Sequence, residues 1–291
     1  MNTTRSGTGV RVATAAILVP ATVAAVWFGP VWLVALLVAL VTLACMEEFL
    51  ALGAQQGLGS YRLWTHTCAL AVVAAQWNAA VGGGGRTGGS ARRWLVSGDG
   101  PPAMGVELAL LAFVLGIAAM VVLGHRALKD VLPSVGTSAS ALLLIALPFS
   151  YMVRLQGLDD GRIWLLFTLA LVWLGDTLAY FVGRRVGRLP LAPQISPQKT
   201  WEGAAANVVG ALLAAAVFSM WLDVGVMHLF TIAVLASLAG QFGDLLESAY
   251  KRGAGVKDSG ALLPGHGGLL DRVDALIFAA PVVWVYAVRL Y

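Results

Sequence analysis

The stretch VWLVALLVALVTLACMEEFLAL, residues 31–52, decides the fold class of this chain. Its side chains are apolar almost throughout, and no charged residue occurs in it before the acidic pair Glu47 and Glu48. An α-helix rises 1.5 Å per residue, so about 20 such residues cross a hydrocarbon core roughly 30 Å thick. The stretch therefore predicts a membrane-spanning helix.

The composition extends this prediction to the whole chain. Of its 291 residues, 59% are hydrophobic and 12% are charged, and the mean hydropathy is +0.81. Soluble domains carry about 25% charged residues, and disordered chains are poor in apolar ones, so both classes are excluded. A transmembrane barrel needs alternating segments of about 10 residues, which the long apolar runs do not provide. We predict an all-α, polytopic membrane helix bundle.

About nine apolar stretches are bounded by charged residues or by Gly and Pro, and we interpret each as a transmembrane helix. They cover residues 12–28, 31–52, 63–81, 106–123, 139–153, 163–182, 203–222, 227–249 and 270–290. We divide the chain into helices 1–3 with a Gly-rich loop (1–100), helices 4–5 (101–160) and helices 6–9 (161–291). The last part carries most of the polar residues found inside apolar stretches, so we expect the functional site there.

The distribution of Lys and Arg predicts the orientation of the bundle. If the spans alternate from a cytoplasmic N-terminus, most of the 19 basic residues fall on the cytoplasmic side. These are Arg5, Arg11, Arg62, Arg126, Lys129, Arg184, Arg185, Arg188, Lys199, Lys251, Arg252, Lys257 and Arg272. Cytoplasmic loops are enriched in Lys and Arg, so we expect the N-terminus in the cytoplasm. Anionic lipid headgroups explain the net charge of +4, and nucleic acid is not an expected partner, because no patch of stacked aromatic and basic residues accompanies the charge.

The densest polar segment is GDLLESAYKRGAGVKDSGALLPGHGGLLDRVD, residues 243–274. Its first part places two carboxylates, a hydroxyl and an ammonium on one helical stripe, formed by Asp244, Glu247, Ser248 and Lys251. Charges at membrane depth are costly and are seldom kept without a use. The Gly-rich loop that follows, with Lys and Arg beside backbone N–H groups near a helix start, is typical of phosphate binding.

Two helices joined by such a loop run antiparallel, which brings Asp244 opposite Asp271. Oxygen ligands on two facing helices, with room for phosphate oxygens and water, suit Mg²⁺. We therefore expect these two aspartates to be metal ligands. The alternative is that Asp271 and Asp274 only match the dipole at a helix start, while Asp244 pairs with Lys251.

A second polar patch combines Asp176, inside an apolar stretch, with the Pro-punctuated loop that follows it. An acid at membrane depth is by default a functional candidate that faces the bundle interior. In the loop, Ser196, Lys199 and Thr200 precede a helix start and suit phosphate oxygens. Thr200 fits a helix N-cap equally well. We interpret the three arginines of residues 184–188 as a membrane anchor.

Residues 248–274, SAYKRGAGVKDSGALLPGHGGLLDRVD, resemble the signature of the phosphatidate cytidylyltransferases, also called CDP-diacylglycerol synthases. Other landmarks of that family also match: Arg11-x-x-Thr14-Ala15, Glu48-Phe49, Asp176-Thr177-x-Ala179-Tyr180, Leu191-Ala192-Pro193 and Ser196-Pro197-x-Lys199-Thr200-Trp201-Glu202-Gly203. The resemblance covers nearly the whole chain. The sequence departs from the family pattern at Gln198 and in a Gly- and Arg-rich insertion at residues 82–100.

The resemblance implies that CTP and phosphatidic acid give CDP-diacylglycerol and pyrophosphate. The expected catalytic residues are Asp244, Asp271, Lys251 and Ser248, and the two aspartates are the expected ligands of Mg²⁺ and of a second cation, monovalent or divalent. Residues expected to contact substrate or to shape its loop are Ser196, Lys199, Thr200, Arg252, Lys257, Asp258, His266, Gly267, Gly268, Arg272, Asp274 and Asp176. The expected partners are CTP, phosphatidic acid and membrane lipids, with a second copy of the chain as a further candidate. We expect the site to face the cytoplasm from the cell (inner) membrane.

Two other functions remain open. A CTP-dependent polyprenol kinase shares the membrane location and the nucleotide, and an ion-coupled transporter could use Asp176, Asp244 and Asp271 as a cation relay. The combination of SPQKTWEG, residues 196–203, with the PGHGG and LDRVD motifs favours the cytidylyltransferase. The chain shows no repeated half, which argues against a transporter.

Overall fold

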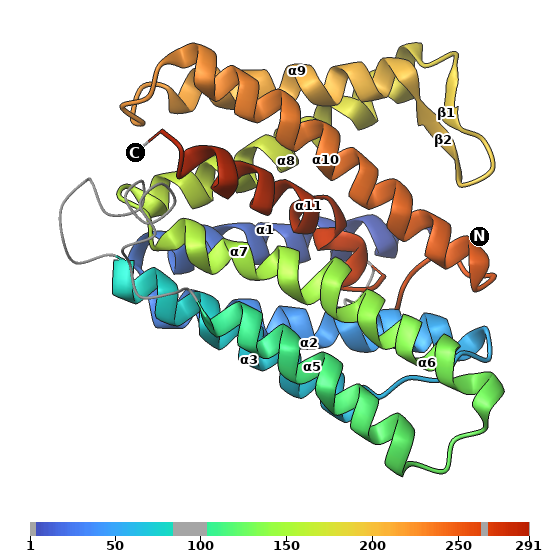
Figure 1. Ribbon diagram of the computed structural model, residues 1–291. Coiled ribbons are helices and arrows are strands. Elements are labelled where there is room, and N and C mark those ends of the chain that lie inside the picture. Colours follow the sequence, from blue (N-terminus) through green and yellow to red (C-terminus); the bar gives the residue numbers. More distant parts are fainter. Residues whose placement is uncertain (1–3, 84–103, 263–266, 291) are drawn as a thin grey trace.

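The structure is a computed structural model that describes residues 4–83, 104–262 and 267–290. Its helices are α1 (Thr4–Phe28), α2 (Val31–Gln55), α3 (Arg62–Gly83), α5 (Met104–Leu123), α6 (Leu128–Ala141), the π-helix η1 (Leu142–Ala146), α7 (Leu147–Gln156), α8 (Gly161–Val186), α9 (Trp201–Phe218), α10 (Val226–Gly253) and α11 (Leu270–Ala287). Strands β1 (Pro190–Ala192) and β2 (Ser196–Thr200) form an antiparallel hairpin between α8 and α9. Figure 1 shows the helices packed side by side, with most axes running roughly along one direction.

The described helices confirm the all-α membrane class. Each apolar stretch expected from the sequence coincides with a helix or with the continuous run from α6 to α7. Within the described residues, six segments are long and apolar enough to cross a membrane: α2, most of α5, α6 through α7, α8, α9 and α10. Helix α3 falls short because it contains His66, Gln76 and Asn78, and α11 because its first turns carry three charged residues. The expected number of nine spans therefore stays a prediction.

The run from α6 to α7 changes its helical period where a proline follows. Pro148 lacks a backbone N–H, and in an α-helix its ring would clash with the carbonyl group of Leu144. The chain widens at this point into η1 and then continues as α7. The run therefore passes the proline without ending, and Leu142 and Ile145 stay buried in the core.

Glycines bring the helices around the polar residues into close contact. At Gly210 of α9, a Cβ atom would lie 2.7 Å from the backbone oxygen of Leu174 and 2.8 Å from Cα of Gly175, both on α8. At Gly243 of α10, a Cβ atom would lie 2.8 Å from the backbone oxygen of Asp274 on α11. Small residues at helix contacts are typical of membrane bundles, in which close packing holds the helices together. The pairs α8–α9 and α10–α11 are therefore fixed tightly around the polar region.

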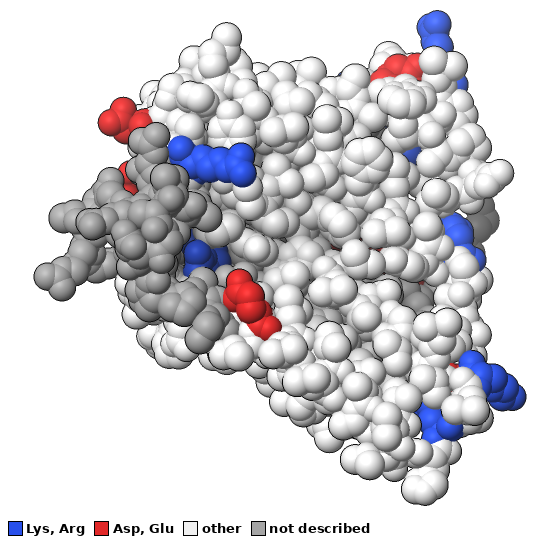
Figure 2. Space-filling model, viewed as in Figure 1, with Lys and Arg blue, Asp and Glu red and all other residues white. Residues whose placement is uncertain are grey.

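Charged side chains gather at the two ends of the bundle. Figure 2 shows them at opposite edges of one face, with a broad uncharged surface between. In Figure 1 the N-terminus of α1, the hairpin and the C-terminal end of α10 lie at one end, while the C-terminal end of α11 lies at the other. The helices thus alternate in direction as the sequence predicts. Which end faces the cytoplasm stays a prediction.

Candidate active site

The hairpin β1–β2 takes the place of the loop expected before α9. Its register pairs Pro190 with Thr200 and Ala192 with Ser196. Thr200 is also the N-cap of α9, since its Oγ1 accepts the N–H of Gly203 at 3.1 Å. The hairpin therefore passes directly into α9, and its polar side chains lie beside the helix ends.

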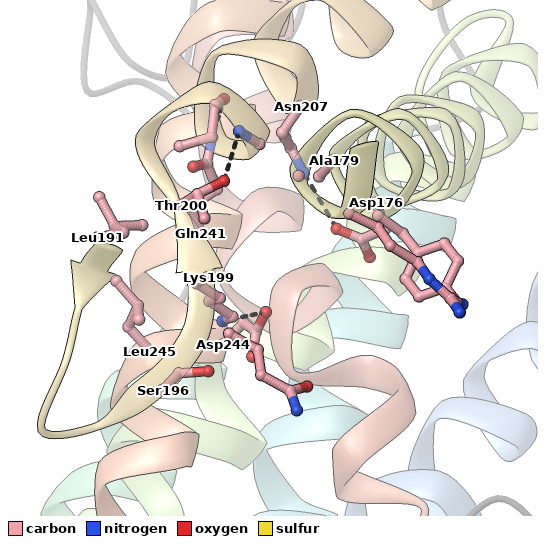
Figure 3. A pocket seen from close by; sticks show the side chains of 16 residues that line it. Asp176, Ala179, Leu191, Ser196, Lys199, Thr200, Asn207, Gln241, Asp244 and Leu245 are labelled. Atoms are coloured by element: carbon pink, nitrogen blue, oxygen red, sulfur yellow. Dashed lines mark hydrogen bonds and ion pairs between the residues drawn. The ribbon is translucent and has the colours of Figure 1, made fainter. Parts of the chain in front are cut away.

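A cavity of about 760 Å³ lies between the hairpin and helices α8, α9 and α10. Figure 3 shows the side chains that line it. Among them are five residues that the sequence singled out, namely Asp176, Ser196, Lys199, Thr200 and Asp244. The second polar patch of the sequence and Asp244 of α10 therefore line the same cavity.

Lys199 and Asp244 form an ion pair in this cavity (Figure 3). Their side chains are 29% and 32% exposed, so a ligand in the cavity can reach both. The alternative in which Asp244 pairs with Lys251 is wrong, because the partner of Asp244 comes from β2 instead.

Asp176 belongs to a chain of hydrogen bonds that crosses three helices. Its Oδ1 accepts the amide N–H of Asn207 on α9 at 3.0 Å (Figure 3). The Oδ1 atom of Asn207 accepts the hydroxyl of Ser237 on α10 at 2.7 Å, and Gln241 donates to that hydroxyl oxygen at 3.3 Å. This network explains how an acid is kept within an apolar helix, and it fixes Asp176 at the cavity wall.

Arg184 also lines the cavity, near the C-terminal end of α8. Its Nη1 donates to the hydroxyl of Tyr180 at 2.7 Å, one helical turn earlier. Arg185 and Arg188 are exposed and do not line the cavity. The anchor interpretation therefore missed one arginine of three. The sequence held no signal for Arg184 in particular, because Phe181 precedes Arg185 by the same four residues that separate Tyr180 from Arg184.

Lys251 is buried between two carboxylates. Its ammonium donates to Oδ1 of Asp271 at 2.5 Å and forms a second ion pair with Glu247, one turn earlier on α10. The side chain of Lys251 is 11% exposed, and those of both acids are 6% exposed. The Glu247 carboxylate also interacts with that of Asp271, on the other side of this lysine. The stripe on α10 is therefore divided, with Asp244 in the cavity and Glu247 and Lys251 in a buried cluster.

Two carboxylates hold the start of α11. Oδ2 of Asp271 accepts the N–H of Ser259 at 3.0 Å and that of Gly268 at 2.8 Å. Glu48 of α2 accepts the N–H groups of the next two residues, both at 2.9 Å. The sequence predicted that N–H groups of this loop and helix start would be offered to phosphate. In the structure, these four groups are satisfied by the chain's own acids.

The other predicted residues lie on α10, on α11 and in the segment between them. Arg252 ties the end of α10 to the hairpin, since its Nε donates to the backbone oxygen of Ile195 at 3.3 Å. Gly267 has a φ of +80°, and a Cβ atom there would lie 3.0 Å from Oδ2 of Asp271, so both backbone and space favour glycine. Ser248 is buried on α10. Exposed positions are taken by Lys257, Asp258 and Arg272. His266 lies outside the described residues.

A metal site is only partly assembled. In the described part of the chain, no three His, Cys, Asp or Glu side chains gather closely enough to hold a metal ion. Asp244 borders the cavity and is within electrostatic range of Asp176 and Asp274. Mg²⁺ commonly takes one or two carboxylates and completes its shell with phosphate oxygens and water. Asp244 fits such a site as it stands, whereas Asp271 already has three donors and would exchange one of them.

Together these features define a helical membrane protein with a cavity lined by Lys, Arg and Asp side chains at one end of the bundle. Such a cavity suits an anionic ligand that carries phosphate groups. The chain belongs to the cytidylyltransferase family, whose sequence model matches residues 9–290. The family resemblance inferred from the motifs is thereby confirmed.

Relatives in three bacteria carry the same name, phosphatidate cytidylyltransferase. The chain is 38% identical over 182 residues to that of Bacillus subtilis (strain 168), which is 62% of this chain and 66% of the relative. It is 37% identical over 179 residues to that of Staphylococcus epidermidis (strain ATCC 12228 / FDA PCI 1200), covering 60% and 69%. It is 48% identical over 126 residues to that of Brucella abortus (strain 2308), covering 42% and 46%. The matched stretches thus span about half to two thirds of the relatives' own lengths.

Proposed function

We propose that the chain is a phosphatidate cytidylyltransferase, which converts CTP and phosphatidic acid to CDP-diacylglycerol and pyrophosphate. Its family and the names of its relatives support this reaction. The observation that carries the proposal is the cavity lined by Lys199, Arg184 and Asp244. Two cations beside a carboxylate suit phosphates and the metal ion that accompanies them. A position at one end of membrane helices suits an enzyme that joins a water-soluble nucleotide to a lipid.

The proposed reaction exchanges one phosphorus–oxygen bond for another. A phosphate oxygen of phosphatidic acid forms a bond to the α-phosphorus of CTP, while the bond from that phosphorus to the bridging oxygen of the β-phosphate breaks. The bonding electrons leave with pyrophosphate. A phosphate monoester is largely ionised at neutral pH, so the site needs no strong general base. Its task is to align two anionic reactants and to neutralise charge on the leaving group.

The roles follow from position. Lys199 and Arg184 contact phosphates in the cavity, and the hydroxyls of Ser196 and Thr200 add hydrogen bonds. Asp176 contributes a fixed carboxylate to the same wall. Residues that complete the proposed site from α10, the following loop and α11 are Ser248, Lys251, Arg252, Lys257, Asp258, His266, Gly267, Gly268, Arg272 and Asp274.

Mg²⁺ is the proposed cofactor, with Asp244 and Asp271 as its protein ligands and a second cation, monovalent or divalent, beside it. When bound, the metal ions neutralise phosphate charge and polarise a phosphoryl oxygen. The exposed carboxylate of Asp244 in the cavity supports this assignment. Three donors hold the carboxylate of Asp271, which would exchange one of them for the metal ion.

The proposed location is the cell (inner) membrane, with the cavity facing the cytoplasm, and a homodimer is the proposed assembly.

Two exposed positions at opposite ends of the bundle test the orientation: Gln194 in the hairpin and Asp159 between α7 and α8. Both native cysteines are buried, so labelling reports the introduced one. An impermeant thiol reagent should label Asp159→Cys in intact cells and Gln194→Cys only after the cells are opened. The reverse pattern would invert the topology.

The reaction is tested by following radiolabel from CTP into lipid. Purified protein receives phosphatidic acid in detergent micelles, Mg²⁺ and CTP labelled at either the α- or the γ-phosphate. We expect label in the lipid fraction only when the α-phosphate of CTP is labelled. Label at the γ-phosphate should leave with pyrophosphate. Label from the γ position would indicate a lipid kinase, and no label from either position would leave the proposed reaction without support.

A further inference from the structure

Glu48 of α2 lies far in sequence from the polar segment and yet contacts its centre. Its Oε2 accepts the hydroxyl of Ser259 at 2.8 Å and the N–H of Leu270 at 2.9 Å. Its Oε1 accepts the N–H of Leu269 at 2.9 Å. One carboxylate from the N-terminal part of the chain therefore binds three donors in total. One of them, Ser259, comes before residues 263–266, and the other two come after them.

Two described glycines before the start of α11 pack directly against this carboxylate. At Gly260, a Cβ atom would lie 2.7 Å from Oε1 of Glu48, and at Gly268 a Cβ atom would overlap Oε2. Both glycines therefore leave the space that Glu48 occupies. The Glu48 carboxylate is therefore packed closely between these two glycines.

Glu48 and Asp271 hold the same short segments. Ser259 gives its hydroxyl to Glu48 and its backbone N–H to Asp271. Gly268 gives its N–H to Asp271, and the next two residues give theirs to Glu48. The position of Asp271, and of the Lys251 ammonium bound to it, therefore depends on where Glu48 fixes the first turn of α11.

We propose that Glu48 is a positioning residue that sets the geometry of Asp271 and Lys251 in the active site. The proposal rests on the proposed function, because it assigns Glu48 a part in the same reaction. A carboxylate at a helix start binds N–H groups by charge-assisted hydrogen bonds and matches the helix dipole. Its negative charge matters as much as its shape, since an amide at this place would turn an N–H toward other N–H donors.

The neighbouring Glu47 provides a matched control. It lies on the same helix, is 51% exposed, and pairs at the surface with Arg62 at 2.8 Å and His66 at 3.1 Å. Exposed pairs of this kind contribute little to stability. Glu47→Gln removes the same charge from the adjacent position without touching the loop.

The experiment compares Glu48→Gln, Glu48→Asp and Glu47→Gln in CDP-diacylglycerol formation, thermal unfolding in detergent and amide hydrogen exchange. We expect Glu48→Gln to lower kcat/KM on the order of tenfold or more, and Glu48→Asp to recover part of the loss. Glu47→Gln should stay within about twofold of the wild type. Peptides that contain residues 259–262 and 268–272 should exchange faster in Glu48→Gln, while peptides from α5 and α8 keep wild-type protection.

A double-mutant cycle with Ser259→Ala adds a second readout. Since the Ser259 hydroxyl acts through Glu48, its removal should cost activity in the wild type and almost none in Glu48→Gln. Activity of Glu48→Gln near that of the wild type would overturn the proposal. So would equal loss in Glu48→Gln and Glu48→Asp with faster exchange in every helix, which would make Glu48 a residue of general stability. If the wild type forms no CDP-diacylglycerol, the proposed function fails, whereas the exchange measurement still tests whether Glu48 fixes this segment.

Discussion

Lys199 on β2 and Asp244 on α10 are paired inside the cavity, 45 positions apart in the chain. Each is about one third exposed, so the pair holds a cation and an anion ready for exchange with a ligand. A phosphate could take the place of the Asp244 carboxylate as the partner of the Lys199 ammonium group. A metal ion could likewise take the place of that ammonium group as the partner of the Asp244 carboxylate. Four predictions test this view of the site and the helices that support it.

The first prediction concerns the carboxylate. Asp244→Asn should reduce lipid labelling at ordinary Mg²⁺ on the order of a hundredfold or more, because an amide neither balances Lys199 nor binds Mg²⁺ well. Asp271→Asn should have a comparable effect, and Asp274→Asn should be better tolerated. Asp223→Asn, at an exposed position after α9, is the control. Retention of most of the wild-type kcat by Asp244→Asn would remove this residue from the metal site.

The second prediction separates two lysines. Lys199→Gln and Lys251→Gln should each lower kcat/KM on the order of tenfold to a hundredfold, because a charge-assisted contact to phosphate is worth roughly 1.5–3 kcal/mol. Only Lys251→Gln should also lower the melting temperature, since it leaves the buried acids Glu247 and Asp271 without their cation. Varying CTP and phosphatidic acid in turn shows which KM rises.

Lys129→Gln, exposed on α6, serves as the control for both lysine variants. If Lys199 only reached toward lipid headgroups, neighbouring arginines would cover its loss. Wild-type kcat/KM for Lys199→Gln would support that membrane-anchoring role and exclude Lys199 from substrate binding. Wild-type kcat/KM for Lys251→Gln would limit Lys251 to stabilising the buried acids.

The third prediction uses two adjacent arginines of α8. Arg184 lines the cavity and Arg185 does not. Arg184→Gln should raise the KM of one anionic substrate about tenfold, whereas Arg185→Gln should leave the kinetics nearly unchanged. Tyr180→Phe, which removes the hydroxyl bound to Arg184, should produce a smaller rise. Equal effects of the two arginine variants would mean that they act only through the overall charge of the membrane surface.

The fourth prediction concerns the contact of α8 with α9. Gly210→Ala places a methyl group against the backbone of α8, where overpacking costs about 1–3 kcal/mol. The melting temperature in detergent should therefore fall. Gly136→Ala on α6 meets nothing within 4 Å and should leave it unchanged or raise it slightly, because alanine favours a helix. A Gly210→Ala variant as stable as the wild type would show that α8 and α9 can separate without cost.

The sequence was sufficient for features that depend on local composition. Long apolar runs determine the membrane class, and the cost of a charge at membrane depth marks Asp176 and Asp244 without knowledge of their partners. The partners themselves depend on tertiary packing. Nothing near Asp244 in the sequence indicates that Lys199 will reach it across a hairpin, because that hairpin forms over helices brought together by glycines.

The partners of the N–H groups before and at the start of α11 also depend on tertiary packing. Gly-rich sequence near a helix start correctly indicates that these groups need an anion. It does not indicate which anion, because Glu48 comes from a helix more than 200 residues earlier. The orientation of Arg184 could not be predicted either, since any of the arginines in residues 184–188 could face the cavity until the position of β2 was known.

The two acids at the start of α11 have a consequence for how a ligand binds. Glu48 and Asp271 bind N–H groups that a phosphate could otherwise bind, so the chain's own acids hold the described parts of this segment in place. Their conformational entropy is lost when the protein folds and not again when a substrate arrives. Binding of the proposed substrate would therefore not have to organise the described parts of this segment.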